Sequence, residues 1–163
     1  RGDVFLSGGA DGTIRRYCTN SGKFVSFWNA HGDDWVTSLA LVQSKDGELV
    51  ISGSTDRTCV LWQLGGGDDD GGRGRKVLVF EGHKEAVWAV EQCDESSFIS
   101  GSWDATVRQW SFISSICLRV FNIGSGVESL CVPAFNLFVT GCDNGKIKLW
   151  FIMTGECVES WTG

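Results

Sequence analysis

A segment of eleven residues occurs four times in this chain and constrains its fold more than any other feature. The copies are SGGADGTIRRY at Ser7–Tyr17, SGSTDRTCVLW at Ser52–Trp62, SGSWDATVRQW at Ser100–Trp110 and TGCDNGKIKLW at Thr140–Trp150. In each copy a small hydroxyl residue precedes a glycine, and an aromatic residue follows nine positions after that glycine. Three copies have aspartate three positions after the glycine, and the fourth has asparagine there. Repetition at this spacing indicates one supersecondary unit that is used four times.

Each copy is predicted to contain two short strands joined by a tight turn. An apolar run such as Leu49–Ile51 precedes the glycine, and an alternating run such as Thr106–Trp110 follows the turn. Alternation of this kind is typical of a half-buried strand, and Gly, Asp and Asn between two such runs are typical of a turn. The closing aromatic residues recur every 40–48 residues, which is the period of a four-stranded β-propeller blade. The sequence therefore predicts an all-β fold.

The residues around these copies resemble the WD40 repeat family. The segment that carries the resemblance best contains Gly82-His83, Val87–Val90, Ser100-Gly101, Asp104 and Trp110. A second set contains His31, Val36, Leu39, Ser52, Gly53, Asp56 and Trp62. The Trp-Asp pair that names the family is absent at the closing aromatic residue, which is followed by Cys18, Gln63, Ser111 or Phe151. The family's Gly-His pair is complete only once. The resemblance implies a WD40-type β-propeller segment with four blades of short antiparallel strands, the first of which lacks its inner strand.

The expected blades divide the chain into four parts. They are a partial blade at 1–28, a blade at 31–80 and two further blades at 82–121 and 123–161. Residues 65–75 contain only Gly, Asp and Arg, so a disordered loop is predicted within the second blade. Propellers remove exposed edges by closing a ring of usually four to eight blades. We therefore expect a piece of a longer propeller; the alternatives are self-association of two copies through unpaired blade edges, or a small incomplete ring.

Two blades contain a set of polar residues that the resemblance implies to be one hydrogen-bonded network each. The sets are His31, Ser52, Asp56 and Trp62 in one blade, and His83, Ser100, Asp104 and Trp110 in the next. A His–Asp–Ser trio also occurs in catalytic triads. A catalytic site is not usually built twice in one chain, whereas a buried network that fixes a turn explains both copies. We therefore assign these residues a structural role and predict no catalytic residues.

The resemblance also implies a docking face, formed by the turns between second and third strands and by the loops that enter the first strands. The candidate partner-binding residues are Trp35, Thr37, Thr55, Ala86, Trp88, Trp103, Glu128 and Asp143. Trp103 is expected at an exposed turn, whereas Trp35 and Trp88 are either exposed hot-spot residues or core residues between blades. This set contains no Arg, the usual ligand of phosphate, so we expect an apolar or basic partner segment.

Charge and cysteine content narrow the class of partner further. A net charge of −6 disfavours binding to nucleic acid or to an anionic membrane surface, since both reward a basic protein. Seven Cys without a Cys-x-x-Cys pair and only two His predict neither a metal site nor a cofactor. The odd number of cysteines predicts a reducing location in the cytoplasm or nucleus.

These patterns together favour a non-catalytic scaffold or adaptor that binds other proteins. A narrower alternative is the substrate-recognition propeller of a ubiquitin ligase or of a signalling protein. The weaker alternative is an enzyme, because the sequence has no glycine-rich phosphate loop opening a helix and no Cys-His pair at useful spacing.

Overall fold

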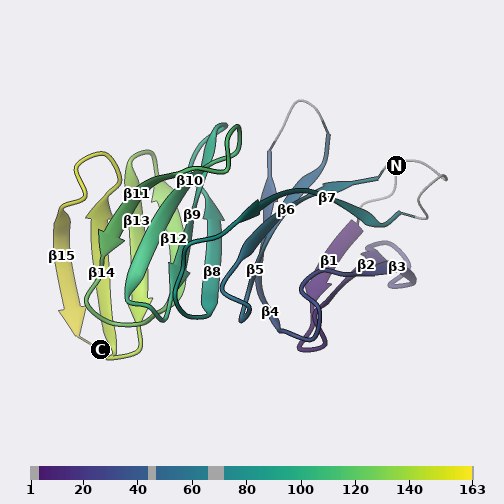
Figure 1. The fold of residues 1–163 in the computed structure, drawn as a ribbon, viewed down its shortest axis with the longest axis horizontal. Helices are drawn as coiled ribbons and strands as arrows, with labels where there is room; N and C mark the ends of the chain where they lie inside the picture. The colour runs from purple at the N-terminus through teal and green to yellow at the C-terminus, as the bar shows by residue number, and fades with distance from the viewer. Residues whose placement is uncertain (1–3, 44–46, 66–71, 163) are drawn as a thin grey trace.

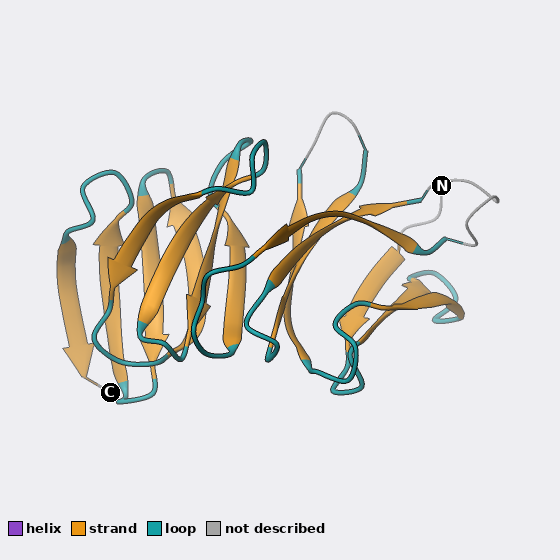
Figure 2. Cartoon of the chain, viewed as in Figure 1, coloured by secondary structure: helices purple, strands orange, loops and turns teal. Residues whose placement is uncertain are grey.

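The four repeats fold into four antiparallel sheets that follow one another in a row (Figure 1). The computed structural model describes residues 4–43, 47–65 and 72–162. In these residues it has fifteen strands and no helix (Figure 2), which confirms the predicted all-β class. None of the described elements is a helix with the length and apolar character needed to cross a membrane.

Each sheet is built from strands in chain order. The first sheet contains β1 (Val4–Gly8), β2 (Thr13–Cys18) and β3 (Phe24–Asn29). The second contains β4 (Val36–Val42), β5 (Leu49–Ser54), β6 (Cys59–Leu64) and β7 (Gly74–Phe80). The third contains β8 (Val87–Gln92), β9 (Ser97–Ser102), β10 (Thr106–Ser111) and β11 (Cys117–Asn122). The fourth contains β12 (Val127–Ala134), β13 (Leu137–Cys142), β14 (Lys146–Phe151) and β15 (Cys157–Thr162).

The sheets are arranged as neighbouring propeller blades. The inner strands β4, β8 and β12 lie next to one another, and the chain passes from the outer strand of one blade to the inner strand of the next. The two ends of the described chain lie at opposite ends of the row (Figure 1). The first sheet has three strands with β1 at its edge, as predicted for a blade without its inner strand.

At each junction between neighbouring blades, a glycine of one blade lies close to a valine of the next. The three pairs are Gly8 with Val36, Gly53 with Val87, and Gly101 with Val127. A Cβ atom on the glycine would lie 2.5 Å, 3.0 Å and 2.5 Å, respectively, from a methyl carbon of the valine. Contacts under 3.0 Å require a shift of the neighbour, and close approach of this kind is a common reason for glycine in a strand. The glycine of each Ser-Gly pair is therefore explained by packing between blades.

The apolar residues form one buried cluster at each of the three junctions between blades. The cluster between the second and third blades includes Phe80, Phe98 and Trp110, whose rings pack in edge-to-face and stacked contacts. Equivalent clusters contain Trp62 at the first junction and Trp150 at the third. The core is thus divided among the blade junctions, as expected when each repeat covers the apolar face of its neighbour.

The predicted bounds of the disordered loop, 65–75, extend too far toward the C-terminus. Gly74 and Arg75 already belong to β7. Gly74 lies against the indole ring of Trp28 in the first blade, where an added Cβ would be 2.6 Å from ring carbons. A glycine-rich segment predicts disorder, but glycine also allows a backbone to approach an aromatic ring this closely. This second property explains the glycine at position 74. Residues 66–71 lie outside the described residues.

The residue after the turn aspartate or asparagine has a positive φ angle in all four copies. The values are 71° at Gly12, 73° at Arg57, 63° at Ala105 and 76° at Gly145. This left-handed conformation costs a residue with a Cβ about 1–2 kcal/mol, and glycine adopts it without that cost. We expect Ala105→Gly to raise the free energy of unfolding by about 0.5–1 kcal/mol in urea denaturation. Ala89→Gly, in the buried strand β8, should lower it; a loss of stability in both variants would contradict the strain at Ala105.

Candidate protein-docking face

A chain of hydrogen bonds in the third blade connects the strand interior to the turn between β9 and β10. His83 Nε2 lies 2.7 Å from Ser100 Oγ, and His83 Nδ1 lies 2.9 Å from Asp104 Oδ2. The indole N–H of Trp110 donates to the same Ser100 hydroxyl at 2.8 Å. Asp104 also accepts hydrogen bonds from the backbone N–H and the hydroxyl of Thr106. The turn is therefore fixed from inside the blade.

The second blade repeats this arrangement with nearly the same distances. His31 lies 2.7 Å from both Ser52 Oγ and Asp56 Oδ2, and the indole N–H of Trp62 donates to Ser52 Oγ at 2.9 Å. The geometry joins the same four residue types in both blades, and all the partners lie within the blade itself. This is the arrangement expected of a structural network, in which each member satisfies the next.

The charge state of Asp104 follows from these contacts. Partial burial of Asp104 raises its pKa, but hydrogen bonds from His83 and Thr106 and from the backbone N–H of Lys84 lower it more, so the pKa lies well below its usual range. Asp56 has the same balance of burial against hydrogen bonds from His31 and Thr58, and its pKa is also lowered. Both carboxylates are therefore ionised at neutral pH and act as fixed acceptors.

The two outer blades lack this network. The indole N–H of Trp150 is buried without a hydrogen-bond partner among the described residues. In the first blade Asp11 instead pairs with Arg15 at the surface. In the fourth blade the difference follows from the sequence, since Ile123 stands 17 residues before Thr140, as His83 stands before Ser100.

The turns fixed in this way contact the loops that enter the inner strands, and the two together form the candidate docking face. In three blades the backbone N–H of the residue before the turn Asp or Asn donates to a loop carbonyl. The pairs are Thr55 to Trp35 at 3.1 Å, Trp103 to Ala86 at 3.1 Å and Asp143 to Gly126 at 3.0 Å. These turns and loops lie along the lower edge of the row in Figure 1. The face is thus held by the same backbone contact in every complete blade.

Three tryptophans occupy this face, and two of them form a pair. Trp35 and Trp103 are 53% and 50% exposed, respectively. Trp88 is half-buried and packs against Trp103 with ring centroids 4.8 Å apart and an angle of 33° between the planes. Trp35 is therefore a surface residue and not a core residue between blades. Trp88 is neither fully exposed nor fully buried. The Trp88–Trp103 pair therefore presents a preformed aromatic surface to solvent.

An acidic side chain lies beside the aromatic pair. A Cβ atom on Gly126 would lie 2.7 Å from Asp143 Oδ2 and 3.2 Å from Trp103 Cδ1, so both side chains flank this glycine. Glu128 and Asp143 are exposed, and neither carboxylate has an ion pair within the described ranges. Gly126 directly precedes the first Val of β12, as Ala86 precedes that of β8, and the repeat pattern predicts this position on the face.

The remaining predicted residues, Thr37, Thr55 and Ala86, are engaged in hydrogen bonds within the protein or are half-buried. The Thr37 hydroxyl is half-buried and lies 2.5 Å from the carbonyl of Val87 in the next blade, so its donor is already used. Thr55 Oγ1 accepts from the backbone N–H of Trp35 at 2.9 Å and donates to Asp34 Oδ1 at 3.2 Å. Ala86 is half-buried. The exposed contact groups on the face are thus the tryptophans and the carboxylates.

The titratable side chains of the described residues include two thiols that burial keeps neutral. Over the described part of the chain, no three His, Cys, Asp or Glu side chains are placed to hold a metal ion. Burial raises the pKa of Cys59 and Cys93 to about 12, which keeps both as neutral thiols rather than nucleophilic thiolates.

Comparison with known proteins identifies the family. The repeat family described as "WD domain, G-beta repeat" matches residues 22–63, 74–111 and 115–150. Because these matches cover more than half of the chain, the protein belongs to the WD40 repeat family, as the sequence predicted.

Three relatives illustrate how far the similarity extends. Autophagy-related protein 16 of Arabidopsis thaliana is 26% identical over 98% of this chain and 30% of its own length. A guanine nucleotide-binding protein subunit beta of Oryza sativa subsp. japonica is 30% identical over 78% of this chain and 34% of its own length. The small ribosomal subunit protein RACK1 of Candida albicans is 40% identical over 47% of this chain and 24% of its own length. The chain thus spans about a third or less of the curated relatives that it matches.

Proposed function

We propose that the protein is a non-catalytic interaction module that binds a segment of another protein on its docking face. The observation that carries this proposal is the Trp88–Trp103 pair, which is exposed beside an unpaired carboxylate, Asp143. Tryptophan supplies large contact area and is enriched among binding hot spots. WD40 repeats and relatives such as RACK1 support this class of function.

The chemistry of the face indicates a partner segment with apolar and basic side chains. A Lys or Arg side chain is attracted to the face of an indole ring, with a contribution of about 0.5–2 kcal/mol. The exposed carboxylates of Glu128 and Asp143 would pair with the same cation. The protein's net charge of −6 favours approach of a basic segment over that of nucleic acid or an anionic membrane surface.

A narrower candidate is a substrate- or partner-recognition propeller within a signalling protein or a ubiquitin ligase. The similarity to a guanine nucleotide-binding protein subunit beta favours the signalling branch. An intracellular location is part of the same proposal, with support from the odd number of cysteines and the burial of the Cys59 and Cys142 thiols. Self-association through the edge strand β1 belongs to the same proposal, and light scattering of the purified protein tests it.

We expect Trp103→Ala to weaken partner binding by at least thirtyfold, because truncating a hot-spot tryptophan costs about 2 kcal/mol or more. The measurement is quantitative affinity capture by the protein and its variants, with the recovered partners compared by mass spectrometry. Asp143→Asn should lower the affinity for a basic partner by a smaller factor and should reduce the salt dependence of binding.

The matched control is Phe24→Ala, which removes an aromatic side chain that is equally exposed on the outer strand β3, away from the docking face. It should leave the recovered partners unchanged. Thermal unfolding of Trp103→Ala close to that of the parent would separate lost contact from lost fold. Retention of every partner by Trp103→Ala would contradict the proposed docking face.

A further inference from the structure

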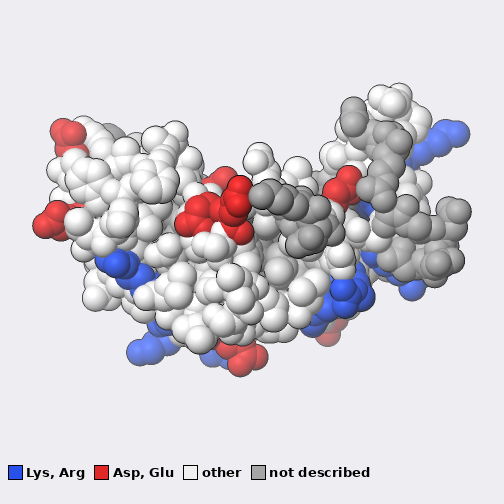
Figure 3. Space-filling model, turned by 90° about the horizontal axis from the view of Figure 1, so that it is seen from above, with Lys and Arg blue, Asp and Glu red and all other residues white. Residues whose placement is uncertain are grey.

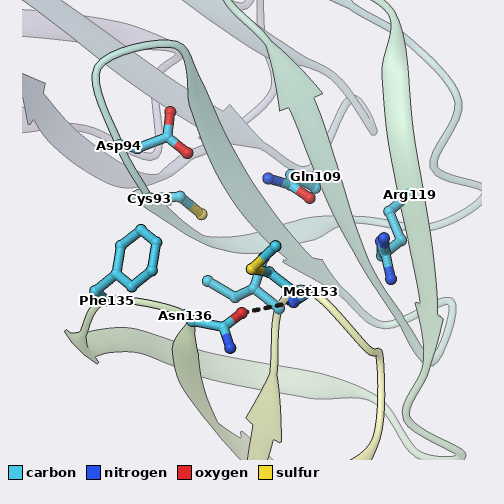
Figure 4. A pocket seen from close by; sticks show the side chains of 8 residues that line it. Cys93, Asp94, Gln109, Arg119, Phe135, Asn136 and Met153 are labelled. Atoms are coloured by element: carbon cyan, nitrogen blue, oxygen red, sulfur yellow. Dashed lines mark hydrogen bonds between the residues drawn. The ribbon is translucent and has the colours of Figure 1, made fainter.

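The opposite ends of the strands carry a separate pocket at the junction of the third and fourth blades (Figure 4). Its volume is about 280 Å³, and the residues that line it are Cys93, Asp94, Gln109, Arg119, Phe135, Asn136, Ile152 and Met153. Figure 3 looks onto this face of the molecule from above, where acidic atoms gather near the middle and a largely uncharged surface extends over the last blade. The pocket shares no residue with the docking face.

A sequence difference between blades explains why the pocket lies at the junction of the third and fourth blades. At the junction of the second and third blades, Gln92 on β8 accepts a hydrogen bond from the backbone N–H of Gln43 through Oε1 at 2.9 Å. This contact connects the two blades across the junction. The equivalent residue on β12 is Val132, whose side chain has no group that could make such a bond to the third blade. The fourth blade therefore lacks this contact with its neighbour.

The wall formed by the fourth blade is preorganised. Asn136, at the β12–β13 turn, has a φ angle of 64°. Its backbone carbonyl accepts from the N–H of Ile152 at 3.0 Å, and its side-chain Oδ1 accepts from the N–H of Met153 at 2.7 Å (Figure 4). These two bonds fix the β12–β13 turn against the β14–β15 loop, and they leave the side-chain Nδ2 of Asn136 as a free donor.

The free polar groups of the pocket are mainly hydrogen-bond donors. The guanidinium of Arg119 lies 6.0 Å from the ring of Phe121 and has no hydrogen bond or ion pair to any described residue. Asp94 is different, because its two carboxylate oxygens already accept from the backbone and hydroxyl of Ser96 at 2.7 Å and from the hydroxyl of Ser97 at 2.8 Å. The positive charge is thus available for a ligand, and the carboxylate oxygens are committed to their own turn.

The pocket also has an apolar rim that nothing in the described structure covers. Phe135 is 85% exposed and Met153 is 66% exposed, although both are large apolar side chains. Covering apolar area contributes about 25 cal/mol per Å². A ligand that covers this rim and also satisfies Arg119 must therefore carry an apolar group next to an anionic one.

We infer that this pocket binds a protein segment in which a large aliphatic side chain stands beside an aspartate or glutamate. The aliphatic side chain packs between Phe135 and Met153, and the carboxylate pairs with Arg119. Asp94 lies across the pocket from Arg119 (Figure 4), so its charge repels a carboxylate placed the other way round and sets the direction of the segment. This partner differs in charge from the basic one proposed for the docking face.

The single methionine of the chain gives this site its own reporter. Protein labelled with ¹³C at the methionine methyl group should show one such signal, from Met153. Titration with acetyl-Gly-Leu-Asp-Gly-amide should shift that signal in a saturable manner. Peptides with Asn or Lys in place of Asp, or with Gly in place of Leu, should bind at least tenfold more weakly, because each loses the charge pair or the apolar contact.

The matched variants are Arg119→Gln and Arg73→Gln, since both remove an exposed arginine and only the first lines the pocket. Arg119→Gln should lower the affinity for the peptide at least tenfold and leave the unfolding midpoint unchanged. Arg73→Gln should leave the affinity for the peptide unchanged. Three results would overturn the inference: no shift of the Met153 signal, equal binding of the Asp and Lys peptides, or unchanged affinity in Arg119→Gln. Failure here would leave the docking face unaffected, because Trp103 plays no part in this assay.

Discussion

Replacing Gly101 with alanine is expected to lower the free energy of unfolding by about 3 kcal/mol. The added Cβ would lie 2.5 Å from Cγ1 and 3.2 Å from Cβ of Val127, and Val127 is fully buried at the junction of two blades. A valine side chain has little freedom to move aside, so β12 itself must shift. Overpacking of a dense core typically costs about 1–3 kcal/mol, and this contact belongs at the upper end. Urea denaturation followed by circular dichroism measures the change.

A double variant tests whether the clash with Val127 is the cause. Val127→Ala alone leaves a cavity and should also destabilise the protein. In Gly101→Ala with Val127→Ala, the new methyl group occupies part of the space that the valine left, so the loss should be clearly smaller than the sum of the single losses. Additive losses would contradict the proposed contact between blades.

Replacing Asp104 with alanine is expected to lower the free energy of unfolding by about 2–3 kcal/mol. The side chain of Asp104 is largely buried and accepts hydrogen bonds from Thr106 and from the Lys84 backbone, in addition to its contact with His83. Its removal leaves these polar groups without their partner, and unsatisfied buried groups cost about 1–3 kcal/mol, more where a charge is involved. Thermal and urea unfolding should both show the loss.

Asp11→Ala is the matched control for this prediction, because Asp11 occupies the equivalent turn of the first blade. Asp11 is exposed and pairs with Arg15 at the surface, and surface ion pairs contribute little to stability. Its replacement should therefore have a much smaller effect than that of Asp104. Equal effects of the two substitutions would show that the network around His83 does not distinguish the inner blades from the first.

The strands were predictable because each repeat has its own turn and alternation signals. The repeat pattern predicts strands at Val87–Gln92 and Thr106–Ser111, which are the bounds of β8 and β10, whereas β9 extends on both sides of its predicted range, Phe98–Ser100, to Ser97–Ser102. The glycine after Ser100 is typical of a turn, yet Gly101 pairs with Val107 within the sheet. Local turn chemistry cannot show that pairing, because it depends on the partner strand and on the neighbouring blade.

The candidate sites depend more on contacts between blades, and the sequence reveals less of them. The position of Trp103 at an exposed turn followed from the repeat pattern, but its packing on Trp88 joins segments that only the fold brings together. The pocket beside Arg119 could not be predicted, because it results from a difference between two junctions, Gln92 at one and Val132 at the next. A repeat pattern predicts what the blades share and gives little information about where they differ.

The most direct test of the central claim is site-specific photo-crosslinking from the docking face. A benzophenone amino acid placed at Trp35, which is exposed on the docking face outside the Trp88–Trp103 pair, should form a crosslink to the captured partner, and the same group at Phe24, on the outer strand of the first blade, should not. The crosslinked partner peptide should contain Lys or Arg beside apolar residues. A partner that crosslinks equally from both positions, or from Phe24 alone, would contradict the assignment of this face as the binding surface.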